Sequence, residues 1–242
     1  MKSDKNSLNI NTVILAVNLG LALALWIGDG LYIRYGAFSV KIITSILFAV
    51  MGAVNLLYIF LARQGNKRFA CVLVAGLVLA MLGDIILEIH FIAGAVLFAL
   101  GHVLFLVSYC FLRKFTFVDF LIGAFIGFLS ILFITLAPIF DFSDDIAMEI
   151  VCIVYALVIS LMVGKAICNF AVDRNWLTFV IMIGSLLFFF SDLMLLLNVF
   201  SSIDKYVGAL CLATYYPAEC LLAFSVYLSA IKNAELIRNS EL

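Results

Sequence analysis

Two aspartates, Asp84 and Asp192, lie deep inside long apolar stretches of the sequence. Asp84 stands in VLVAGLVLAMLGDIILEI and Asp192 in VIMIGSLLFFFSDLMLLLNVF. An acid at membrane depth costs about 3 kcal/mol on insertion scales, so such a residue is by default a candidate for a functional site. Two carboxyl groups in an apolar cavity suit acid–base chemistry, because desolvation and mutual repulsion favour a proton on one while the other stays ionised. The alternative is that both acids only hydrogen-bond to Ser or Asn across helices.

Further polar residues accompany the aspartates at similar depth. If 69–91 and 176–200 are helices, each aspartate lies about 6 Å past the helix midpoint toward the outer side, so we expect the two to share a depth. His102 lies near the middle of the next stretch, within expected reach of Asp84, and Glu219 near the middle of the last. We therefore predict two catalytic aspartates with these supporting or substrate-binding residues: His102, Glu219, Lys41, Tyr215, Tyr216 and Glu88.

Each supporting residue also has a structural interpretation. His102 could be a hydrogen-bonded core histidine, and Glu88 a solvated acid near the outer boundary. Lys41 could be an interfacial anchor whose long side chain reaches toward the head groups. We expect Asp29 to mark the outer end of the first helix.

Motifs of other chemistries are missing from the sequence. It contains no GxSxG, no HExxH and no phosphate loop, and its two histidines exclude a three-histidine zinc site. We therefore expect no metal and no cofactor, and hydrolysis by acid–base catalysis with water. Two alternatives remain open: a proton-coupled carrier that uses the same acids, and a metal-dependent lipid hydrolase.

The composition indicates which elements must position these residues. The 242 residues are 67% hydrophobic and 12% charged, with a mean hydropathy of +1.26, which is typical of an integral membrane protein. The net charge of −1 gives no reason to expect nucleic acid, and the six scattered cysteines indicate no disulfide. We predict one polytopic domain over 1–242, all-α, with eight transmembrane helices near 10–33, 38–61, 69–91, 93–112, 117–140, 146–170, 176–200 and 206–231.

The basic residues predict the orientation. If the N-terminus is cytoplasmic, eleven of the 14 basic residues fall on that side, and Arg34, Lys41 and Lys205 on the other. The acid-rich connection at 141–145 then lies outside, and eight spans place both termini in the cytoplasm.

The surroundings of the two aspartates repeat. Gly76 lies eight residues before Asp84, and Gly184 lies eight before Asp192. GDIIL at 83–87 matches SDLML at 191–195, and GHVLF at 101–105 has its counterpart in AECLL at 218–222. This favours two four-helix halves in parallel orientation, with chance as the alternative in a sequence so rich in Gly and Leu.

At these residues the sequence resembles the YhhN-like lysoplasmalogenase family of eight-helix membrane proteins. The resemblance is carried by motifs in the third, fourth, seventh and eighth helices and by a basic residue that opens the second. They are GDIIL (83–87), FIAG (91–94), GHVLFLVSY (101–109), GSLLFFFSD (184–192), YYPAE (215–219) and Lys41. Glu219 departs from the family pattern, which has Gln there, and this bears on the substrate and the pH optimum.

The resemblance implies hydrolysis of the vinyl ether bond of lysoplasmalogens to a fatty aldehyde and a glycerophospho-ethanolamine or -choline. The partners would be a lysophospholipid-type substrate and bilayer lipid, with no nucleic acid and no protein partner named. The expected location is the inner membrane of a bacterium. Asp84 and Asp192 would share the acid and base roles, His102 would orient one of them, and Lys41 would contact the substrate phosphate.

Overall fold

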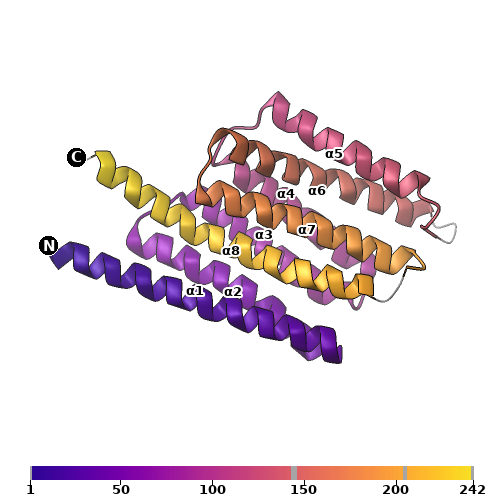
Figure 1. Ribbon diagram of the computed structural model, residues 1–242, viewed down its shortest axis with the longest axis horizontal. Helices are drawn as coiled ribbons and strands as arrows, with labels where there is room; N and C mark the ends of the chain where they lie inside the picture. Colours follow the sequence, from indigo (N-terminus) through magenta and orange to yellow (C-terminus); the bar gives the residue numbers. More distant parts are fainter. Residues whose placement is uncertain (1, 143–145, 204–205, 241–242) are drawn as a thin grey trace.

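The computed structural model describes residues 2–142, 146–203 and 206–240, and every predicted helix is present in them. The helices are α1 (Lys2–Tyr35), α2 (Phe38–Ala62), α3 (Lys67–Leu87), α4 (Phe91–Cys110), α5 (Phe117–Leu136), α6 (Ile146–Val172), α7 (Trp176–Phe200) and α8 (Tyr206–Ser240). They lie alongside one another in a bundle (Figure 1). For the described residues, the predicted all-α class is confirmed.

Several helix ends differ from the expectation by a few residues or more, and two of the differences are informative. α5 ends at Leu136 and not near residue 140, because the residue before a proline is pushed out of the helical region and Ala137, before Pro138, is extended (φ −75°, ψ 120°). α1 continues through Asp29 to Tyr35, so the prediction that Asp29 marks a helix end is wrong. Asp29 is instead a buried acid inside the helix.

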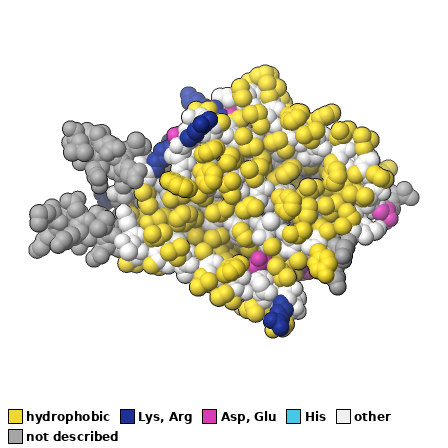
Figure 2. All heavy atoms as spheres, viewed as in Figure 1, with side chains coloured by type: hydrophobic (Ala, Val, Ile, Leu, Met, Phe, Trp, Pro, Cys, Tyr) yellow, Lys and Arg dark blue, Asp and Glu magenta, His cyan; other side chains and the backbone are white. Residues whose placement is uncertain are grey.

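The outer surface of the bundle is apolar. All eight helices of the described chain are long and apolar enough to cross a membrane, the shortest spans having 20 residues. Hydrophobic side chains cover most of the face in Figure 2, and Trp26 and Leu61 are 72% and 75% exposed. Such a surface requires lipid as its solvent, so the chain is a multi-pass integral membrane protein.

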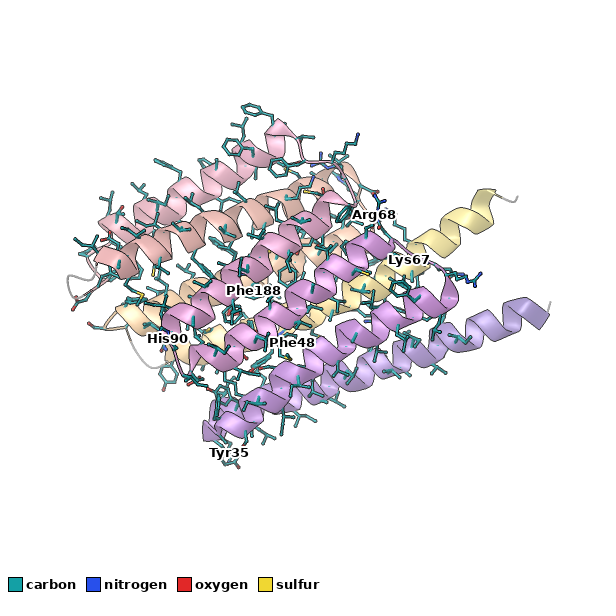
Figure 3. The ribbon with its side chains drawn as sticks, turned by 180° about the vertical axis from the view of Figure 1, so that it is seen from behind. Tyr35, Phe48, Lys67, Arg68, His90 and Phe188 are labelled. Carbon is teal, nitrogen blue, oxygen red and sulfur yellow. The ribbon has the colours of Figure 1, made fainter. Side chains whose placement is uncertain are left out.

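The two ends of the bundle differ. Both termini lie at one end (Figure 1), and Lys67 and Arg68 lie at that same end, opposite Tyr35 (Figure 3). This agrees with an even number of spans, and which end faces the cytoplasm stays a prediction. That prediction also used positions that lie outside the described residues or side chains: Lys2, Lys5, Lys205, Arg238 and 143–145.

The helices pack in two matching sets. α1 packs on α2, α2 on α3 and α3 on α4, while α5 packs on α6, α6 on α7 and α7 on α8. Between the halves, α2 packs on α8 and α6 packs on α4, which are equivalent contacts if α1–α4 corresponds to α5–α8. The backbones of α1 and α3 also pack closely on α8, whereas α5 and α7 do not pack in this way on α4 within the described helices; α7 meets α4 through side chains alone.

The match extends to close backbone approaches. A Cβ at Gly76 would lie 3.2 Å from the carbonyl oxygen of Gly101, and a Cβ at Gly184 would lie 3.3 Å from that of Ala218. Gly101 and Ala218 open the two segments, GHVLF and AECLL, that correspond in the sequence. These contacts agree with the predicted repeat of two four-helix halves, which stays a prediction.

The closest approach in the second half joins α5 to α6. A Cβ at Gly164 would lie 2.5 Å from the backbone nitrogen and 2.6 Å from the Cα of Gly123. Real Cβ atoms do not come this near to a backbone, and a backbone in a helix cannot move away locally. Small residues at this crossing therefore set the distance between the two helices.

We predict that Gly164→Ala destabilises the protein by about 1–3 kcal/mol, the usual cost of overpacking a tight contact. Gly20→Ala is the matched control, since a Cβ at Gly20 meets nothing within 4 Å. Thermal unfolding in detergent measures both. Equal melting temperatures for the two variants would show that α5 and α6 are not tightly packed at Gly123 and Gly164.

Candidate active site

Asp84 lies where α2, α3 and α8 meet, and it forms a buried ion pair. Its Oδ1 lies 3.1 Å from Nζ of Lys41. Its Oδ2 accepts hydrogen bonds from Ser45 Oγ at 2.5 Å and Tyr216 Oη at 3.0 Å. Asp84 and Lys41 are each 4% exposed. All three neighbours donate to the carboxyl group, so this environment suits an ionised Asp84.

Glu88 extends this cluster toward the end of the bundle opposite the termini. Its Oε1 lies 2.7 Å from Lys41 Nζ and accepts a hydrogen bond from Tyr32 Oη at 2.9 Å. Partial burial acts to raise the pKa of Glu88, but the hydrogen bonds from Lys41 and Tyr32 outweigh it and lower the pKa. Lys41 is therefore not an interfacial anchor, because its buried amine links two acids.

Asp192 lies on the other side of the bundle core and has different partners. Its Oδ2 accepts a hydrogen bond from Tyr155 Oη at 2.7 Å and lies 3.2 Å from His102 Nε2. His102 Nε2 also lies 2.8 Å from Tyr155 Oη. His102 is fully buried, and its Nδ1 has no partner among the described residues. A proton on Nδ1 would be a buried unpaired donor, and this favours the tautomer with its proton on Nε2.

The structure gives His102 a different partner from the one expected. The sequence placed it within reach of Asp84 across the α3–α4 hairpin, but its hydrogen bonds go to Asp192 and Tyr155. The ring turns toward α7, where it packs edge-on against Phe188 at 4.6 Å between centroids. Phe188 lies in the middle of the bundle (Figure 3).

An apolar cavity of about 320 Å³ opens beside Asp192. It lies between α4, α5, α6 and α7, and its walls are almost entirely aliphatic and aromatic, with Phe98, Phe133 and Phe189 among them. Asp192 and Tyr155 both line it. Both hydrogen bonds of Asp192 fall on Oδ2, which leaves Oδ1 available to a bound molecule. A cavity of this kind fits a hydrocarbon chain with one polar group held at the acid.

Glu219 lies between the two aspartate clusters. It is fully buried, and neither carboxyl oxygen has a hydrogen-bond partner among the described residues. It is close enough to interact electrostatically with both Asp84 and Asp192. Tyr215, one helical turn before it, also has an unpaired hydroxyl, and its ring packs on Phe188 at 5.3 Å. An unpaired carboxylate is very costly at this depth, so Glu219 is expected to be protonated or to bind water.

The two aspartates occupy equivalent places in the two halves. Asp84 contacts α2 of its own half and α8 of the other, while Asp192 contacts α6 of its own half and α4 of the other. No hydrogen bond joins the two aspartates within the described residues, so they do not form a direct pair; Glu219 is within electrostatic range of both and hydrogen-bonds to neither. Only Asp192 lines the large cavity.

Sequence reasoning included Tyr216 in the site but missed three other hydroxyl groups. Tyr155 and Ser45 donate directly to the two aspartates, and Tyr32 donates to Glu88. A tyrosine in the middle of an apolar helix carries a hydroxyl that needs a partner when it is buried. That signal could have identified Tyr155, but serine is too common in membrane helices to single out Ser45.

A separate buried cluster lies at the terminus-bearing end of the bundle. Asp119 pairs with Lys165 at 2.9 Å and with Arg113, and its Oδ2 accepts from the backbone of Thr116 at the start of α5. Lys165, counted in the sequence as an orienting charge, is fully buried here and also donates to the carbonyl of Lys114. The charges of this cluster are paired with one another, and none of its residues lines either described cavity. We therefore infer a structural role, in which the cluster holds α5 and α6 to the end of α4.

The bundle and its buried acids define a polytopic membrane protein with charged clusters among its helices, and comparison with known proteins identifies the family. The model of the YhhN family matches residues 44–226, and the chain belongs to this family. Asp84, His102, Asp192 and Glu219 fall inside the matched region, and Lys41 precedes it. Searches of curated proteins and of solved structures found no match.

We predict that Lys41→Ala destabilises the fold by about 3–5 kcal/mol, because it leaves Asp84 buried without its counter-ion. Lys232→Ala is the control. Lys232 pairs with Asp173 at 2.6 Å on the surface, and such exposed pairs contribute about 0–1 kcal/mol. Thermal unfolding in detergent compares the two. A Lys41→Ala variant as stable as Lys232→Ala would refute an ionised pair.

Proposed function

We propose that the protein is a membrane-embedded hydrolase that cleaves the vinyl ether bond of lysoplasmalogens. One observation carries the proposal: a carboxyl group, a tyrosine and a histidine are joined at the wall of a cavity suited to a hydrocarbon chain. Membership of the YhhN family supports it. Among the described residues, no three His, Cys, Asp or Glu side chains are placed to share a metal ion, so acid–base chemistry fits the site better.

Hydrolysis of a vinyl ether requires a proton and a water molecule. An acid delivers the proton to the alkenyl carbon remote from the ether oxygen, which gives an oxocarbenium ion. Water adds to the carbon beside the oxygen and loses a proton to a base. The resulting hemiacetal collapses to a fatty aldehyde and the free glycerol hydroxyl. A positioned carboxyl group can serve both proton transfers and stabilise the cation between them.

Asp192 is the carboxyl group best placed for this chemistry, with the alkenyl chain in the apolar cavity and Oδ1 toward the reacting carbons. Tyr155 and His102 act as positioning residues, because both hold Oδ2. Asp84 supplies a fixed negative charge, and Glu219 serves as the buried proton reservoir between the two. Lys41 is paired with Asp84 and Glu88, so it can contact the substrate phosphate only after it gives up one of these two carboxylates.

We predict that Asp192→Asn lowers aldehyde release by about 100- to 10,000-fold, the usual contribution of general acid–base groups. Asp173→Asn, at an exposed carboxylate, is the control and should retain wild-type turnover. The assay follows aldehyde formation from a lysoplasmenyl-ethanolamine by purified protein in detergent. Turnover near the wild-type level in a folded Asp192→Asn variant would remove Asp192 from the mechanism.

The competing function, a proton-coupled carrier, uses the same acids. A second measurement on the same preparation distinguishes the carrier from the hydrolase: proton flux across the membrane of liposomes that contain the protein. The hydrolase proposal expects aldehyde release without substrate-driven proton flux. Substrate-driven flux without aldehyde would favour the carrier.

We further predict that a bulky residue in the cavity impairs binding of the chain and spares the chemistry. Ala156 lines the cavity and is buried, so Ala156→Phe should fill part of its volume. The expected result is a rise in KM of about tenfold or more for long alkenyl chains, because each buried CH₂ contributes about 0.8 kcal/mol. Short-chain substrates are the control and should be affected less. An equal effect at all chain lengths would place the chain elsewhere.

A further inference from the structure

A second cavity, of about 290 Å³, lies between α1 and α8. Its walls include Leu25, Trp26, Asp29 and Tyr216. Apart from Asp29 and the ring of Tyr216 the lining is mainly apolar, and α1 is the helix with the most exposed span, so the cavity borders the lipid. It lies outside the cavity beside Asp192, with which it shares no lining residue.

Asp29 is a buried acid without a partner in this cavity. It is 4% exposed, and its Oδ1 is fully buried with no hydrogen-bond partner among the described residues. A carboxyl group at membrane depth that contacts no donor bears its full desolvation cost unless a ligand or a proton satisfies it. Asp29 thus points to a ligand that brings a donor or a positive charge.

The lysine nearest to this cavity is already paired. Tyr216, which forms a wall of the cavity, donates its hydroxyl to Asp84. Asp84 and Glu88 share a single amine, that of Lys41. Asp29 makes no ion pair among the described residues, so a bound cation would give it a counter-ion of its own.

The cavity lining decides which cation fits. A metal ion needs several oxygen or nitrogen ligands, and this cavity offers one carboxyl group among apolar residues. An organic ammonium group is held well by one carboxylate together with aromatic faces, and Trp26 and Tyr216 supply two rings. The apolar wall that borders the lipid fits a hydrocarbon tail.

We propose that the cavity between α1 and α8 is a binding site for amphiphilic amines, with Asp29 as counter-ion and Trp26 and Tyr216 as aromatic walls. The hydroxyl of Tyr216 connects this site to Asp84. The proposal does not depend on vinyl ether hydrolysis, because it concerns a ligand bound away from Asp192.

The test uses the fluorescence of Trp26 in the full-length protein. The chain has two tryptophans, so Trp176→Phe leaves Trp26 as the only reporter. This variant is purified in dodecyl maltoside and titrated with dodecyltrimethylammonium. The amine has the same dodecyl tail as the detergent and differs from it in its head group. We expect a saturable change in fluorescence, and an affinity at least tenfold weaker after Asp29→Asn. Asp173→Asn is the matched control and should leave the affinity unchanged.

A second variant keeps the test decisive if Asp29→Asn fails to fold. Ala22→Phe fills the cavity with Asp29 intact and should also abolish saturable binding. A change that never saturates, or that is the same with and without the Asp29 carboxylate, means that the amine only partitions into the micelle, and overturns the proposal. Aldehyde release is measured separately, so a failure here leaves the hydrolase question untouched.

Discussion

A carboxylate can stay ionised inside this bundle only where something neutralises or solvates it. Three of the buried acids meet this requirement in different ways, while Asp29 and Glu219 have unpaired carboxyl oxygens among the described residues. Asp84 has a buried lysine, Asp119 has both a lysine and an arginine, and Asp192 has a tyrosine and a histidine beside a cavity. Each solution draws side chains from several helices, because one helix cannot supply all the donors. The positions of the acids therefore constrain how the helices meet.

The contrast between Asp84 and Asp192 is informative because the two positions are equivalent by the internal repeat. A lysine and a serine of α2 occupy one site, and a tyrosine of α6 together with a histidine of α4 occupies the other. The first set closes around its carboxylate with donors on both oxygens. The second has hydrogen bonds on one oxygen alone, and its acid lines an apolar cavity. Of the two aspartates, only Asp192 lines this cavity.

Much of this architecture could be predicted from the sequence. Helix-length apolar runs between polar breaks identify the eight spans, and the costly acids identify the site, since both signals are strong in a membrane. The expected family is confirmed by the match over 44–226. The partner of His102 could not be predicted, because depth along a helix says nothing of the direction in which a side chain points. Asp29 was misjudged for a related reason: an acid near the end of an apolar run can equally cap the helix or lie buried inside it.

The hydrogen bonds across the two halves have a further consequence. If one half existed alone and paired with a second copy of itself, two-fold symmetry would give it two identical acid sites. A lysine that neutralised one site would then neutralise the other, and a cavity beside one would require a cavity beside both. Joining the halves in one chain removes this restriction, so that one site can be closed by an ion pair while its counterpart stays open. The internal repeat thus supplies two equivalent sites, and the continuous chain allows them to differ.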